Sequence, residues 1–331
     1  MNQATRVPIW VGVGVSVVSL VVVFQRADLS QVASILVQVD QNTMAMAAAL
    51  QLAVTVVLGV RWQLLFRVPP RLAGLVKALF VAQLANAAMP LRLGMIVRAY
   101  LVSRSEERSK VTILATIGAE KVFDALASLL ICVIALSVFA PEWLQWSTIG
   151  PRGLMVVVCM MAVVLVTRKR HQLLRLATQL IKRYSWFRRL NLRQRFEDSL
   201  EGLVGLQKLR TFALLCCWSV AIVVMGVVVN YLIMRALHID ASMLAAILLF
   251  AALQIGNKLL PAAPLGGIGV FQFICMEALA LFGVSREQGV SYGLLLQFVV
   301  LVPGSILGVI ALYRMRSSLR QLEEEAGKQR D

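Results

Sequence analysis

Three charged residues occur together inside one long apolar run of the sequence. Glu120, Lys121 and Asp124 lie within residues 111–139, which we predict to form a membrane-spanning helix. Glu120 would lie about 14 Å from the start of this helix, because an α-helix rises about 1.5 Å per residue. A charge at that depth costs about 2.5–3.5 kcal/mol on insertion scales. Such residues generally pair with one another and mark a pathway through the membrane.

The partners of these charges suggest two kinds of site. Lys121 can pair with Asp124 across three residues of the helix. Glu120 needs another partner, and we expect Arg92 or Arg98. In one interpretation the charges form a structural network of ion pairs. In the other, Arg92 and Arg98 bind a phosphate through paired hydrogen bonds, and the carboxylates of Glu120 and Asp124 release it or take up a proton.

Two apolar segments, 72–102 and 241–282, are each broken by proline and glycine. One pattern recurs in both segments 171 residues apart, as Gln83, Asn86 and Pro90 and then as Gln254, Asn257 and Pro261. The breaks continue with Gly94 in the first segment and with Pro264, Gly266, Gly267 and Gly269 in the second. We therefore predict two hairpins of broken helices, the first re-entrant, related as an internal repeat.

A broken helix inside a membrane leaves backbone polar groups without partners, at several kcal/mol each. Asn86 and Asn257 precede the prolines by four residues and are suited to cap those groups. This role is structural in one interpretation. In the other, the asparagines and the half-helix ends line a polar cavity for a headgroup, and Lys258 is the second hairpin's counterpart of the basic residues in the first.

The composition requires a membrane around these elements. Hydrophobic residues make up 59% of the chain and charged residues 15%, and the mean hydropathy is +0.79. The apolar runs are continuous, unlike the alternating segments of about 10 residues in a membrane barrel. We predict an all-α polytopic membrane protein of about six spans and the two hairpins. The expected spans cover residues 8–24, 43–66, 111–139, 153–166, 211–234 and 289–313.

The basic residues indicate the orientation of the chain. They cluster at 67–77, 92–110, 168–210 and the C-terminal tail, which should all be cytoplasmic, together with the N-terminus. The hairpins then open toward opposite sides, as in an inverted repeat. We expect a first repeat at 1–167, a basic amphipathic surface linker at 168–210, a second repeat at 211–313 and a charged tail at 314–331. The expected location is a bacterial inner membrane.

Other chemistry finds little support in the sequence. The net charge of +16 is explained by topology and anionic headgroups, so we expect no nucleic-acid partner. We find no catalytic, metal-binding or nucleotide-binding motif, and we expect no cofactor. Arg61 and Trp62 lie near the end of an apolar helix, where we interpret them as an anchor at the membrane interface.

Several of these motifs resemble the transmembrane region of lysylphosphatidylglycerol synthases, also called flippase-like integral membrane proteins. The resemblance rests on residues 86–98, on 120–124 and on 260–271. It implies translocation of a lipid or a lipid-linked sugar, without lysyl transfer, because we find no soluble aminoacyl-transfer domain. Relatives often carry a glutamate where Gln272 stands and an arginine where Gln297 stands, and usually an arginine at Lys121. Loss of both partners of an ion pair leaves no buried charge unpaired.

Three functions remain open at this point. The first is translocation of an anionic phospholipid or a lipid-linked glycan between the two hairpins. The second is a non-catalytic partner of a lipid or glycan synthase or glycosyltransferase, with the basic linker as its docking surface. The third is an integral-membrane transferase, for which Glu120 and Asp124 are the only visible acid–base pair.

Overall fold

The computed structural model describes residues 16, 18–23, 25–66, 68–88, 93–106, 108–139, 209–259 and 268–328. Within these ranges the chain is helical with short turns and contains no strand, which confirms the predicted all-α class. The predicted helix at 153–166 lies outside the described residues, as do most of 8–24 and of the basic linker.

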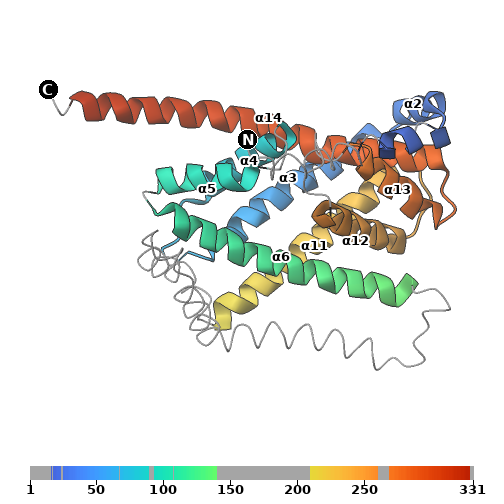
Figure 1. Cartoon of the computed structure of the whole chain (residues 1–331), viewed down its shortest axis with the longest axis horizontal. Helices are drawn as coiled ribbons and strands as arrows, with labels where there is room; N and C mark the ends of the chain where they lie inside the picture. Colours follow the sequence, from blue (N-terminus) through green and yellow to red (C-terminus); the bar gives the residue numbers. More distant parts are fainter. Residues whose placement is uncertain are drawn as a thin grey trace. The chain divides into compact units, whose positions relative to one another are not determined.

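The described helices follow the predicted segments closely. The helices, labelled in Figure 1, are α2 (Leu29–Val37), α3 (Gln41–Gln63), α4 (Leu72–Ala88), α5 (Gly94–Ser105), α6 (Lys110–Phe139), α11 (Leu209–Ala236), α12 (Met243–Leu259), α13 (Val270–Ala280) and α14 (Arg286–Lys328). The last helix is longer than the predicted span of 289–313. It continues into the charged tail because Leu, Arg, Glu and Ala there all favour helix.

Three of the described helices are long and apolar enough to cross a membrane. They cover residues 41–63, 210–236 and 286–314. Helices α4, α12 and α13 are apolar but shorter. Helix α6 has 30 residues, or about 45 Å of length, and it carries the three predicted charges. The chain is thus a multi-pass membrane protein.

The chain divides into two compact units, and both hairpins belong to the first. This unit comprises residues 1–59, 71–102 and 225–331, and the second comprises 60–70 and 103–224. Within the first unit, α14 packs along α4, α13 and α2 (Figure 1). These two units do not correspond to the two predicted sequence repeats at 1–167 and 211–313, and the repeats stay a prediction.

Glycines on α14 allow this close packing. A Cβ atom at Gly308 would lie 2.5 Å from the backbone oxygen of Phe80 in α4. A Cβ at Gly289 would lie 2.8 Å from the Cα of Met276 in α13. Small residues let membrane helices approach closely where no hydrophobic effect drives their association. Larger side chains at these two positions would therefore separate α14 from its neighbours.

An acidic residue marks the start of the first long span. Asp40 directly precedes α3, accepts a hydrogen bond from the backbone N–H of Asn42 at 3.1 Å and accepts another from the hydroxyl of Thr43. This is the arrangement of an N-cap, which satisfies amide groups at the open end of a helix. The hydrogen bonds, that of the Thr43 side chain most of all, hold the pKa of Asp40 below its ordinary value.

The second unit forms around the end of α3. Trp62 stacks at an angle against Phe66, with ring centroids 5.9 Å apart, and the guanidinium of Arg108 lies 5.3 Å from the Phe66 ring. Arg108 also donates to the backbone oxygen of Val68 at 2.7 Å. These contacts hold the turn after α3 next to the start of α6, and they position the last turn of α3 in the site described below.

Candidate functional site

Helix α6 presents a row of polar side chains along one face. Thr116, Glu120, Asp124 and Ser128 follow one another at intervals of four residues, which places them on the same side of the helix. Thr116 and Glu120 are buried in the structure. The row covers 13 residues, and its ends are about 18 Å apart along the helix. In the sequence only its two acids stand out as charges in an apolar run, although Thr116 and Ser128 extend the row at the same spacing.

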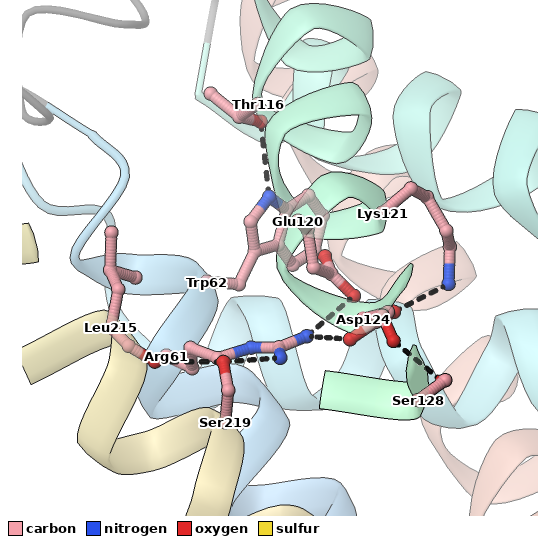
Figure 2. Close-up of polar contacts among 9 residues, drawn as sticks. All are labelled: Arg61, Trp62, Thr116, Glu120, Lys121, Asp124, Ser128, Leu215 and Ser219. Carbon is pink, nitrogen blue, oxygen red and sulfur yellow. Dashed lines mark hydrogen bonds and ion pairs between the residues drawn. The ribbon is translucent and has the colours of Figure 1, made fainter. Parts of the chain in front are cut away.

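Arg61 from α3 lies at the centre of this row (Figure 2). Its Nη2 atom lies 2.6 Å from Asp124 Oδ1 and 3.6 Å from Glu120 Oε1. Its Nη1 atom donates to the Ser219 hydroxyl of α11 at 3.1 Å, and that hydroxyl donates to the backbone oxygen of Leu215 at 2.7 Å. We call Arg61, Glu120, Asp124 and Ser219 the Arg61 cluster.

The prediction that Arg61 and Trp62 anchor the chain at the membrane interface is wrong. Both side chains are buried, and the Trp62 indole N–H donates to the hydroxyl of Thr116 at 3.0 Å. No acidic residue lies within one turn of Arg61 in α3. An arginine inside an apolar helix then requires partners from other helices, and α6 supplies them.

The predicted pair of Lys121 and Asp124 is confirmed, with Lys121 Nζ 3.0 Å from Asp124 Oδ2. The two oxygens of Asp124 thus serve two cations, Lys121 and Arg61. The structure places Arg61 beside Glu120, with Nη2 3.6 Å from Glu120 Oε1, a pairing that the sequence does not reveal. Arg98 is buried in α5, and its pairing with Glu120 stays a prediction. Arg92 lies outside the described residues.

In the first hairpin, Asn86 caps the second half-helix as predicted. Its Oδ1 atom accepts a hydrogen bond of 2.8 Å from the backbone N–H of Gly94, the first residue of α5. Only glycine fits here, because a Cβ at Gly94 would collide with the backbone oxygen of Ala82 and lie 2.5 Å from Asn86 Oδ1. Pro90, between the two half-helices, lies outside the described residues.

In the second hairpin, a glutamine caps the half-helix α13. Gly269 has a φ of +93° and donates from its backbone N–H to Gln272 Oε1 at 2.7 Å. Gln272 Nε2 in turn donates to Gln297 Oε1 of α14 at 2.6 Å, and both glutamines are buried. Gln272 and Gln297 are thus direct partners in this chain, joined by a neutral hydrogen bond.

The remaining predicted residues of the second hairpin are not tested by these contacts. The side chains of Asn257 and Lys258 in α12 lie outside the description, and so do Pro261, Pro264, Gly266 and Gly267. The predicted glycine break is described only at Gly269. There a side chain would also meet the backbone oxygen of Ser16, since a Cβ would lie 2.5 Å from it.

Apolar spanning helices, helix ends capped by polar side chains and a buried ionic cluster together define a multi-pass helical membrane protein with a polar interior site. The chain belongs to the family described as the lysylphosphatidylglycerol synthase TM region, whose model matches residues 9–308. This membership points to membrane lipid modification or translocation. A comparison with curated proteins gave no significant match.

Proposed function

We propose that this protein is a lipid translocase of the bacterial inner membrane, which moves an anionic phospholipid or a lipid-linked glycan between leaflets. The observation that carries this proposal is the Arg61 cluster. A buried arginine, a buried glutamate and a partly buried aspartate lie among apolar helices of a membrane protein, where each uncompensated charge costs several kcal/mol. Such charges in membrane proteins generally mark the path of a polar or ionic substrate.

The hairpins support the same proposal. Helix interruptions inside a membrane are tolerated where they are buried or line a polar cavity, and in transporters with inverted repeats they lie at the substrate site. Asn86 and Gln272 satisfy the backbone at the two breaks. In the proposed orientation both termini are cytoplasmic, and the basic segment 168–210 collects anionic lipid on that side.

The second candidate is a non-catalytic membrane partner of a lipid or glycan synthase. It is favoured by the engagement of Asn86 with the backbone, because a purely structural hairpin needs that bond and no substrate. Under this candidate, deletion within 168–210 should abolish co-purification of the synthase. Neutralisation of Glu120 should leave co-purification intact.

The test is transbilayer movement of a headgroup-labelled anionic lipid in proteoliposomes. An impermeant quencher reports the fraction of label that is accessible from outside. Wild-type protein is compared with Glu120→Gln and Arg92→Ala. Glu277→Gln serves as the matched control, because Glu277 is half-exposed and, among the described residues, forms an ion pair only with the exposed Arg26. Rapid movement that is lost in Glu120→Gln and Arg92→Ala and retained in the control supports translocation. Wild-type rates equal to those of empty liposomes, across several headgroups and with a proton gradient, contradict it.

A further inference from the structure

The geometry of the Arg61 cluster points to the place of the substrate phosphate. We propose that the phosphodiester of the transported lipid displaces the Asp124 carboxylate from Arg61 and binds there. The displaced carboxylate stays with Lys121. This inference rests on the proposed translocation of lipids and names the side chain that holds their shared chemistry, since phospholipids and lipid-linked glycans both carry a phosphate ester.

Arg61 has a donor to spare for such an anion. The Arg61 side chain is only 2% exposed. Of its three nitrogens, only Nη2 donates a hydrogen bond to Asp124 Oδ1. Nη1 is used by Ser219. Nε is buried and has no hydrogen-bond partner in the part of the chain that the structure describes. A phosphodiester presents two equivalent oxygens to the guanidinium fork and can engage Nη2 and Nε together.

Asp124 is the carboxylate that can leave. Its side chain is 28% exposed, whereas that of Glu120 is 3% exposed. Its second oxygen is already held by Lys121, whose side chain is 58% exposed, so Asp124 keeps a cationic partner after it leaves Arg61. Glu120 remains near Arg61. The arginine therefore faces two negative groups before the exchange and two after it.

Removal of the Asp124 carboxylate distinguishes this exchange from a purely structural ion pair. Asp124→Asn deletes the charge that opposes the phosphate, so a phosphate lipid should bind about tenfold more tightly or better, as expected for loss of a competing charge-assisted bond. Arg61→Lys removes Nε and the fork and should weaken binding by about tenfold or more. Lys121→Gln leaves the displaced carboxylate without its second cation, so it should also weaken binding.

The experiment measures equilibrium binding of phosphatidylglycerol to the purified full chain in a neutral detergent by native mass spectrometry. Asp28→Asn is the matched control for Asp124→Asn, because Asp28 lies at the start of α2 and bonds only local groups among the described residues. Arg26→Lys is the control for Arg61→Lys. Soluble glycerol phosphate forms a second arm, and binding of that ester without binding of the lipid would overturn the lipid assignment.

The outcomes separate this inference from the proposed function. Tighter binding in Asp124→Asn, together with weaker binding in Arg61→Lys and Lys121→Gln, supports the exchange. Equal or weaker binding in a folded Asp124→Asn protein overturns it, even if wild type moves lipid in proteoliposomes. If Asp124→Asn does not fold, unchanged binding in Lys121→Gln overturns it instead. Predicted binding without any transbilayer movement would overturn the translocase and leave the phosphate site standing.

Discussion

Replacement of Arg61 by methionine tests whether the Arg61 cluster supports the fold. Methionine keeps most of the volume and the apolar stem of arginine but removes the cation between Glu120 and Asp124. The side chain of Glu120 is fully enclosed, so its carboxylate cannot gain solvent in the folded state. The substitution therefore leaves negative charge with too little compensation inside the protein.

The expected loss follows from the burial of the partners. Breaking a buried ion pair by removing one partner costs about 3–5 kcal/mol. The lower end applies here, because Asp124 retains Lys121 at 3.0 Å and is partly exposed. A loss of about 3 kcal/mol corresponds to a decrease in Tm of about 6 °C at roughly 2 °C per kcal/mol. If Glu120→Gln and Asp124→Asn are added to Arg61→Met, most of this loss should be recovered, since the two carboxylates that Arg61 compensates are removed together with it.

Thermal unfolding can be followed in detergent with a thiol-reactive dye in a background where the other four cysteines (132, 159, 216 and 217) are replaced by alanine, because Cys217 is exposed in the folded protein. The remaining thiol, Cys275, is fully buried and reacts only when the helices separate. Arg26→Met is the matched control. Arg26 forms an exposed ion pair with Glu277, and such pairs contribute about 0–1 kcal/mol. An unchanged Tm in Arg61→Met would refute the buried cluster and restore the interpretation of Arg61 as an interface anchor. A triple variant less stable than Arg61→Met would refute the charge-based account of the loss.

Three further predictions concern packing, capping and pH. Gly308→Leu should lower the Tm and the yield of folded protein, because α14 has no room for a side chain there. Gly118→Leu is the control and should lower neither, because a Cβ at Gly118 has no neighbour within 4 Å. Equal Tm values for the two variants would contradict the packing of α14. Gln272→Leu removes two buried hydrogen bonds, so it should cost roughly 1–3 kcal/mol in the same unfolding assay, and an unchanged Tm would contradict the cap at α13. The depressed pKa of Asp40 means that its contribution to stability is present at neutral pH and is lost as pH falls through the folded-state pKa. The Tm difference between wild type and Asp40→Ala should therefore be constant down to about pH 4 and shrink below it, and a difference that stays constant well below that pH would contradict the N-cap assignment.

Features that depend on local sequence were predictable. The boundaries of α6 and of the half-helices follow from continuous apolar runs and from proline and glycine, which act on their own neighbours in the chain. The pair of Lys121 and Asp124 follows from helix geometry alone. Asn86 was identified as a cap because a broken helix must satisfy its backbone nearby. In each case the sequence distance between the partners is short.

The partner of a buried charge is a different problem, as Arg61 shows. Because a charge inside a membrane is costly, a buried charged residue must have a partner, but this cost does not indicate which helix supplies the partner. Arg61 and Asp124 are 63 residues apart, and Arg61 and Ser219 are 158 apart. The position of Arg61 near a helix end favoured an anchor, because a long side chain can extend from such a position to the interface. Only the contacts of the last turn of α3 with α6 and with the first part of α11, all within the second unit, show that the Arg61 side chain is buried instead.

The neutral pair of Gln272 and Gln297 shows how the two halves of the chain can differ in mechanism. An amide pair satisfies its own hydrogen bonds without a net charge, so it can hold α13 against α14 while any substrate charge passes elsewhere. The second unit, by contrast, contains Arg61, Glu120 and Asp124. These three side chains are charged, so each interacts electrostatically with an approaching anion. If a phosphate lipid moves through this protein, its charge should therefore be recognised at the Arg61 cluster. The pair of Gln272 and Gln297 should then affect transport only through the packing of α13 against α14. Charge-restoring substitutions at Gln272 and Gln297 would then alter stability more than the dependence of transport on headgroup charge.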